Sequence, residues 1–92
     1  MSTQQSVALA HLLTRGVDAC HARDVEELRR VVIALTGTLD FRYEAAARSL
    51  AAMYDRGLSE AEHGRFELAR AVCRRMRAAL IETGDDLDGH RR

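Results

Sequence analysis

Residues 39–80 read LDFRYEAAARSLAAMYDRGLSEAEHGRFELARAVCRRMRAAL, and this stretch decides the fold. Apolar residues recur at steps of three and four on both sides of His63-Gly64, which is the spacing of one face of an α-helix. The first stripe comprises Tyr43, Ala46, Ala47, Leu50, Met53, Tyr54, Gly57 and Leu58, and the second comprises Phe66, Ala69, Val72, Cys73, Met76, Ala79 and Leu80. Neither stripe is stable in water, so we predict two helices that turn at His63-Gly64 and pack together.

The first half of the chain predicts another pair of helices. Ser6 is the expected N-cap of a helix that runs to about Ala22. Asp24 is expected to cap the next helix, with Glu27 completing a capping box. The inner faces are Val7, Ala10, Leu13, Val17 and Cys20, widened by Leu9 and Leu12, and then Val25, Leu28, Val31, Val32, Leu35 and Leu39.

Glycine and capping residues mark the remaining boundaries. Thr36-Gly37-Thr38 is expected to end the second helix, and Asp40 to cap the third. The third helix should continue to Ala61 or Glu62, unless Ser59 starts a new helix there. The fourth is expected to reach about Thr83, with residues 1–5 and 84–92 as disordered tails of a single domain, 1–92.

A weak internal repeat organises these four helices. A shift of 41 residues, from Gly16 to Gly57, aligns the apolar positions of the first two helices with those of the last two. Each half is therefore a helical hairpin, and the predicted fold is an all-α, antiparallel four-helix bundle. Glycine inside a helix costs about 1 kcal/mol relative to alanine, so Gly16 and Gly57 are expected where helices approach closely.

Composition limits the classes of function. The 92 residues are 47% hydrophobic and 30% charged, with no proline, which is typical of a small globular domain. All 14 basic residues are arginine and 14 residues are acidic, so the zero net charge argues against a dedicated nucleic-acid binder. No apolar run reaches the length of a membrane span. We expect a cytoplasmic protein in which Cys20 and Cys73 are buried and reduced.

No residue pattern indicates catalysis. The four histidines are scattered without metal-site spacing, and no phosphate loop or nucleophile motif is present, so we expect no enzyme activity, no metal and no cofactor. Arg70, Arg74 and Arg77 form a strip along the fourth helix. This strip is interpreted as a solvated face paired with neighbouring acids, or alternatively as a docking site for an acidic partner or nucleic acid.

The third helix offers a sharper candidate for binding. Alanine and serine at positions 45–47, 49, 51 and 52 make its surface smooth, which permits close packing by a neighbouring or visiting helix. Tyr43, Met53 and Tyr54 supply adaptable or amphipathic side chains of the kind found in helix-binding grooves. The alternative is that these residues are ordinary bundle core.

The third and fourth helices resemble the flagellar export chaperone FliS family. The similarity rests on Leu39-Asp40, Glu44-Ala45, Leu50, Met53-Tyr54-Asp55, Arg56, Leu58 and Glu60-Ala61, followed by an arginine-rich last helix, and extends weakly to residues 22–26. It covers about half the chain. Relative to the family, the second helix and the third-to-fourth junction are shorter, and MSTQQS stands where the family has a tyrosine-bearing segment.

The resemblance implies a cytoplasmic helical bundle without enzymatic activity. Such chaperones hold the disordered C-terminal segment of flagellin as helices along hydrophobic grooves and prevent its premature polymerisation. The implied partner is that segment or another flagellar export protein, with neither nucleic acid nor membrane insertion. The expected partner-binding residues are Leu39, Tyr43, Ala47, Leu50, Met53, Tyr54 and Leu58. The alternatives are a structural homodimer that buries the same stripe, and a regulatory bundle that docks an acidic partner.

Overall fold

The computed structural model describes the backbone of residues 3–89, and the side chains of this range except those of Thr3, Phe41 and residues 81–89. Four α-helices follow one another: α1 (Thr3–Ala22), α2 (Val25–Gly37), α3 (Glu44–Glu62) and α4 (Glu67–Gly89), with a short 3-10 turn, η1 (Phe41–Tyr43), before α3. The all-α, four-helix prediction is confirmed. The helices extend further than expected at both ends, since α1 starts before Ser6 and α4 continues past Thr83.

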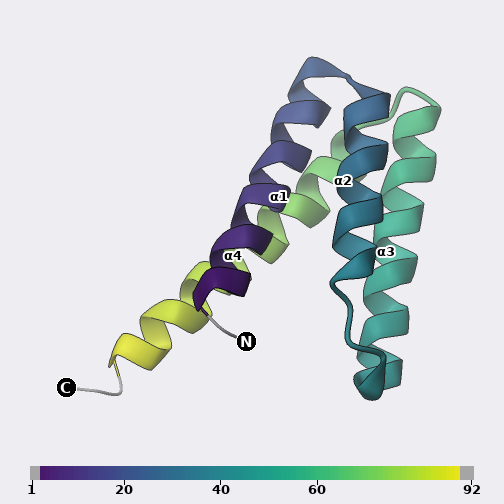
Figure 1. The fold of residues 1–92 in the computed structure, drawn as a ribbon. Helices are drawn as coiled ribbons and strands as arrows, with labels where there is room; N and C mark the ends of the chain where they lie inside the picture. The colour runs from purple at the N-terminus through teal and green to yellow at the C-terminus, as the bar shows by residue number, and fades with distance from the viewer. Residues whose placement is uncertain (1–2, 90–92) are drawn as a thin grey trace.

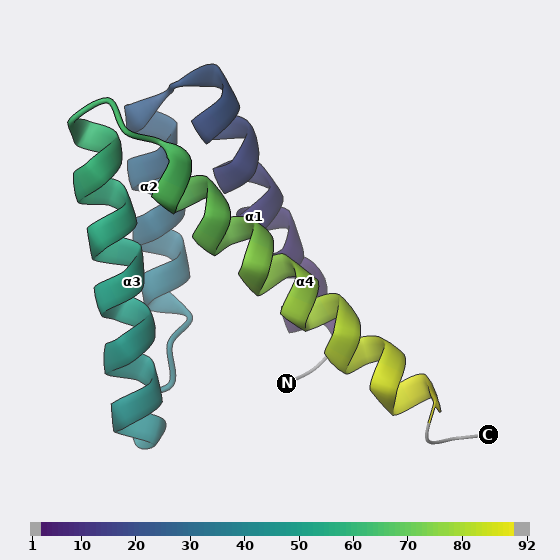
Figure 2. The same ribbon diagram turned by 180° about the vertical axis from the view of Figure 1, so that it is seen from behind.

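The four helices form an elongated, splayed bundle (Figures 1 and 2). It measures 47 × 28 × 18 Å. Helices α2 and α3 run side by side. Helix α4 starts near the end of α3, then diverges from α3 and runs along α1. The α1–α2 and α3–α4 hairpins predicted from the repeat are both present.

The core fills the half of the bundle nearest the two hairpin turns. Leu13, Leu28, Val31 and Leu35 are its most completely buried large side chains. Around them lie other buried residues from all four helices: Val17, Ala19, Cys20, Val32, Tyr54, Ala61, Phe66, Ala69, Val72 and Cys73. The inner faces expected for α2 and for the first turns of α4 are therefore confirmed. Val7 is 51% exposed and does not belong to the core, because the far end of α1 lies outside this half.

Both hairpin turns have the same backbone geometry, which gives the 41-residue repeat a structural meaning. Arg23 and Gly64 are equivalent under the shift, and both have a left-handed backbone, with φ of 56° and 83°. In each turn an amide donates across the helix end, from Asp24 to the Ala19 carbonyl (2.8 Å) and from Arg65 to the Glu60 carbonyl (2.9 Å). This is the bonding of a Schellman motif. The two helices that start a hairpin thus end in the same way.

The two turns also meet in space, at the end of the bundle where all four helices are packed. Arg23 Nη2 donates to the Gly64 carbonyl at 2.8 Å, and its guanidinium lies 5.0 Å from the centre of the Phe66 ring. Because a cation over an aromatic face is attracted to the ring quadrupole, this contact joins the hairpins. Gly16 and Gly57 face α4 closely: added Cβ atoms would lie 2.7 Å from Cys73 Sγ and 3.1 Å from Ala69 Cα. The predicted close approaches are confirmed.

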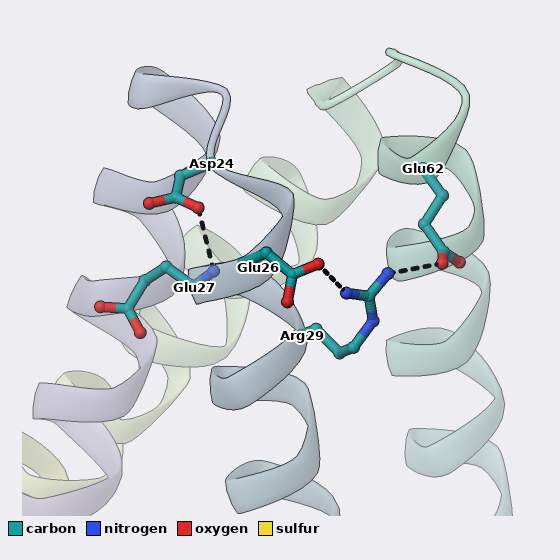
Figure 3. Close-up of polar contacts among 5 residues, drawn as sticks. All are labelled: Asp24, Glu26, Glu27, Arg29 and Glu62. Carbon is teal, nitrogen blue, oxygen red and sulfur yellow. Dashed lines mark hydrogen bonds and ion pairs between the residues drawn. The ribbon is translucent and has the colours of Figure 1, made fainter.

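Capping by Asp24 is confirmed, but the expected capping box forms only in part (Figure 3). Its carboxylate accepts from the Glu27 amide at 3.1 Å. The Glu27 carboxylate instead pairs with Arg15 of α1 at 2.7 Å, because the hairpin brings a guanidinium within reach. Arg29 contacts Glu26 on its own helix, and its Nη2 lies 3.0 Å from Glu62 Oε2 of α3. Arg29 therefore links α2 to α3 at the end of the bundle that holds the hairpin turns.

The chain enters α3 differently from the prediction. The Asp40 carboxylate accepts from the Arg42 amide at 3.0 Å, which closes the tight turn η1, and the α-helix begins only at Glu44. Asp40 therefore caps the 3-10 turn rather than α3 itself. Ser59 lies inside α3 and starts no new helix. This entry places Tyr43 outside the regular helix, where 70% of its surface is exposed.

Candidate partner-binding cleft

A cleft of about 620 Å³ lies between the N-terminal half of α1 and the α2–η1 connection. This volume is typical of binding sites. Its lining residues are Gln5, Ala8, Leu9, Leu12, Gly37, Thr38, Asp40, Arg42 and Tyr43. The cleft occupies the end of the bundle away from the hairpin turns, where α1 and α2 separate in Figure 1.

The residues that α1 turns toward α2 explain this separation. Ala19, Gly16, Leu12 and Leu9 follow one another at steps of three and four, so they share one face of the helix. Near the turn this face carries small, buried residues, which let the helices touch. Further along it carries leucines, and α2 ends at Gly37 with no further helical turn opposite them. Leu9 and Leu12 are consequently only partly buried, and they form the apolar wall of the cleft.

The opposite wall is polar but carries a matched pair of charges. Arg42 binds the Asp40 carboxylate through both Nε (3.0 Å to Oδ1) and Nη2 (2.7 Å to Oδ2). The hydrogen bonds from Arg42 hold the pKa of Asp40 below its ordinary value. Thr38 donates its hydroxyl to the Leu35 carbonyl at 2.6 Å and so ends α2. The cleft therefore has one apolar wall and one polar wall without excess charge, which suits an uncharged apolar stripe with polar flanks.

The residues expected to bind a partner are divided between the core and the surface. Ala47 and Tyr54 are buried (3% and 6% exposed), and burial raises the pKa of the Tyr54 hydroxyl. Those packed against the core at its edge are Leu39, Leu50 and Leu58. Tyr43 lines the cleft, whereas Met53, 40% exposed, lines a separate narrow space with residues of α2 and α4. They do not form one surface.

The expected groove along α3 is only a narrow crevice. Met53 and Tyr54 line a space of about 10 Å³ with residues of α2 and α4. A single water needs at least about that volume, so no side chain of a partner fits. Gly57 and Ala69 of α4, which approach closely, both line this crevice. A larger concave surface lies beside α1, where Leu9 and Leu12, expected to widen the inner face of the first helix, line a cleft together with Tyr43, which was expected to bind a partner.

The two cysteines lie in the core, and His63 lies at a helix end. Cys20 and Cys73 are free and buried, as expected, and burial raises the pKa of both thiols, that of Cys73 to about 11. A buried, protonated thiol is a poor nucleophile. Within the described part of the chain, no group of three histidine, cysteine or acidic side chains is arranged to hold a metal ion. His63 points its Nδ1 at the Ser59 carbonyl (2.8 Å), a contact at the end of α3.

Comparison with protein-family models, curated proteins and solved structures finds no match to the chain. Among the described residues, no helix has the length and apolar character needed to cross a membrane. The geometry of the cleft and the resemblance noted in the sequence are therefore the basis for a functional proposal.

Proposed function

We propose that this protein is a FliS-like export chaperone. In this proposal it binds an amphipathic helical segment of flagellin, or of another flagellar export protein, in the cytoplasm and prevents premature assembly of that protein. The observation that carries the proposal is the cleft beside α1, with its apolar wall of Leu9 and Leu12 and the exposed ring of Tyr43 at η1. The resemblance of α3 and α4 to the FliS family supplies the identity of the partner.

The chemistry of the cleft favours a helix as its ligand. An amphipathic helix carries an apolar stripe flanked by polar residues, which matches one apolar wall and one polar, charge-neutral wall. Each large apolar side chain that a partner buries here contributes about 1.5–3 kcal/mol. Because Leu9 and Leu12 already lie against the core, they present a fixed surface and lose little side-chain freedom on binding.

Tyr43 is the residue to test first. Its ring is 70% exposed, so its replacement by alanine removes contact area without opening the core. Tyrosine combines a large apolar face with one polar atom and is over-represented among residues that dominate binding energy. We expect Tyr43→Ala to weaken binding by at least about tenfold. Ile33, which is 66% exposed on α2 and outside the cleft, provides the matched control Ile33→Ala.

The experiment is isothermal titration calorimetry with the C-terminal segment of flagellin from the same source, together with circular dichroism of the mixture. The proposal predicts a 1:1 complex in which the segment gains helix, a clear loss of affinity for Tyr43→Ala, and none for Ile33→Ala. Absence of binding by the wild-type protein would exclude flagellin as the partner. Equal affinity of all three proteins would show that the ligand binds outside the cleft.

A further inference from the structure

Arg42, on the polar wall of the cleft, has an unused edge on its guanidinium. A guanidinium carries five N–H groups in one plane, and more than one of its edges can hold a carboxylate. The edge formed by Nε and Nη2 binds Asp40, at 3.0 Å to Oδ1 and 2.7 Å to Oδ2. Nη1 forms no hydrogen bond with any residue that the structure describes. The edge formed by Nη1 and Nη2 is therefore open to a second carboxylate.

The Asp40 carboxylate, in contrast, has little capacity left for a ligand. Its Oδ1 accepts from the Arg42 amide and from Nε, both at 3.0 Å, and its Oδ2 accepts from Nη2. These bonds hold Arg42 by its backbone and by its side chain, so they also fix the position of the guanidinium. The pair is neutral in total, but it offers hydrogen-bond donors rather than acceptors. Arg42 lines the cleft with 86% of its side chain exposed, so a ligand in the cleft can reach it.

Among the described side chains, no other arginine lines the cleft. Those that pair with an acid elsewhere are Arg15, Arg29, Arg48 and Arg65. The arginine strip on α4 was expected to pair with neighbouring acids, but no described carboxylate lies within 4 Å of its three arginines. Arg77 of this strip donates to the Thr14 hydroxyl of α1 at 3.4 Å. Recognition of a charged group in the cleft therefore depends on Arg42 and Asp40.

We propose that Arg42 makes the cleft selective for an amphipathic helix that carries an aspartate or glutamate beside its apolar stripe. This selectivity presupposes that the cleft binds a helix, as in the proposed function, and specifies the chemistry of that helix. A helix with its side chains is about 10–12 Å wide, so a helix whose apolar stripe lies on Leu9 and Leu12 turns its flank toward the opposite wall. An acidic residue three or four positions from a stripe residue lies on that flank. Its carboxylate there accepts hydrogen bonds from the open edge of Arg42.

Two synthetic peptides test this selectivity on the whole chain. Both are amphipathic helices with leucine at every third or fourth position, one with glutamate and the other with glutamine at the flanking positions. Fluorescence anisotropy would give the Kd of each. Pairing with an exposed arginine is expected to lower the Kd of the glutamate peptide by roughly threefold to tenfold relative to the glutamine peptide. This preference should shrink between about 50 mM and 500 mM salt, because exposed charges are screened.

Variants of the pair separate a direct contact from a general effect of charge. Asp40→Asn/Arg42→Gln removes both charges without changing the net charge, and it should bind the two peptides equally. Asp40→Asn alone removes the nearby carboxylate and keeps the guanidinium, so its preference for the glutamate peptide should increase. Arg30→Gln, which removes an exposed arginine of α2 outside the cleft, is the matched control and should keep the wild-type preference. Circular dichroism of each variant checks that the fold persists.

Three results would each overturn the selectivity: equal binding of both peptides by the wild-type protein, binding of neither, or a preference that survives in Asp40→Asn/Arg42→Gln. Titration with the flagellin segment decides the proposed function separately. If the wild-type protein binds that segment but does not distinguish the two peptides, the chaperone proposal stands and the selectivity fails. If the peptide preference is present but the segment does not bind, flagellin is excluded as the partner and the selectivity stands.

Discussion

Gly16 lies where α1 presses on α4, and an alanine there should collide with one particular atom. A Cβ added at Gly16 would lie 2.7 Å from Cys73 Sγ and 3.4 Å from Val31 Cγ1. The sulfur can move only by rotation about χ1, and at 4% exposure its packed neighbours oppose that rotation. Overpacking costs about 1–3 kcal/mol, whereas replacing a helical glycine by alanine gains about 1 kcal/mol. We expect Gly16→Ala to reduce the free energy of unfolding by about 1 kcal/mol, or about 4–8 °C in Tm.

Removal of the sulfur should reverse most of this effect. Cys73→Ala alone leaves a small void and should cost about 1 kcal/mol, on the scale of a deleted methyl group. In the double variant the carbon added at Gly16 meets Val31 Cγ1 at 3.4 Å and the Cβ at position 73 at 3.7 Å, which are ordinary contacts. The added methyl group also occupies part of the void. The loss of stability in the double variant should therefore be smaller than the sum of the two single losses, by about 1 kcal/mol or more.

Urea unfolding followed by far-UV circular dichroism, under reducing conditions, measures all four proteins of this double-mutant cycle. Gly37→Ala is the control, because an added Cβ there has no atom within 4 Å, and it should be neutral or stabilising. Losses that add to within about 0.5 kcal/mol would show that Gly16 and Cys73 do not touch. The packing of α1 on α4 described above would then be wrong.

Three further predictions test other contacts. Gly57→Ala should lower Tm, because the new Cβ would lie 3.1 Å from Ala69 Cα, and a backbone atom cannot rotate away. A Gly57→Ala variant as stable as Gly37→Ala would contradict this packing. Burial raises the pKa of Cys73 from 9.0 to about 11, so folding favours the thiol, and this contribution is complete below pH 9 and lost as the pH rises toward 11. Urea titrations should therefore show stability falling over that range, less steeply in Cys73→Ala, and an identical slope would refute the assignment. Arg23→Ala should lower the free energy of unfolding by about 1–3 kcal/mol, because it removes the hydrogen bond to the Gly64 carbonyl. Arg23→Gly should lower it by about 1 kcal/mol less, because glycine adopts the left-handed backbone at φ 56° without strain. Equal thermal midpoints for the two variants would argue against that strain.

The features that the sequence predicted well are those fixed by local periodicity. Steps of three and four identified the four helices and most of their buried residues, and the 41-residue shift identified the two hairpins. Gly16 and Gly57 indicated close approach of two helices, because glycine destabilises a helix and is expected there when a side chain would not fit. The common geometry of the turns at Arg23 and Gly64 follows from the same repeat, although an arginine gives no signal of a left-handed backbone.

The location of the cleft could not be predicted in this way, because it depends on the angle between helices. The angle between α1 and α2 depends on the side-chain volumes along one face of α1, which increase from Ala19 near the turn to Leu12 further away. The helical periodicity of apolar residues does not distinguish small from large side chains. Adjacent residues on α3 show the same limit, since Tyr54 is buried and Met53 is 40% exposed. Pairing of Glu27 with Arg15 rather than with its own helix end likewise required the neighbouring helix.

The central claim, that the cleft beside α1 binds a helical segment of an export substrate, is tested most directly by amide NMR. The wild-type protein would be titrated with the C-terminal segment of flagellin while the chemical shift of each backbone amide is followed. The account predicts saturable shifts concentrated at Leu9, Leu12, Thr38 and Tyr43, with small changes along the outer face of α4. Unchanged spectra, or shifts confined to α3 and α4, would contradict it.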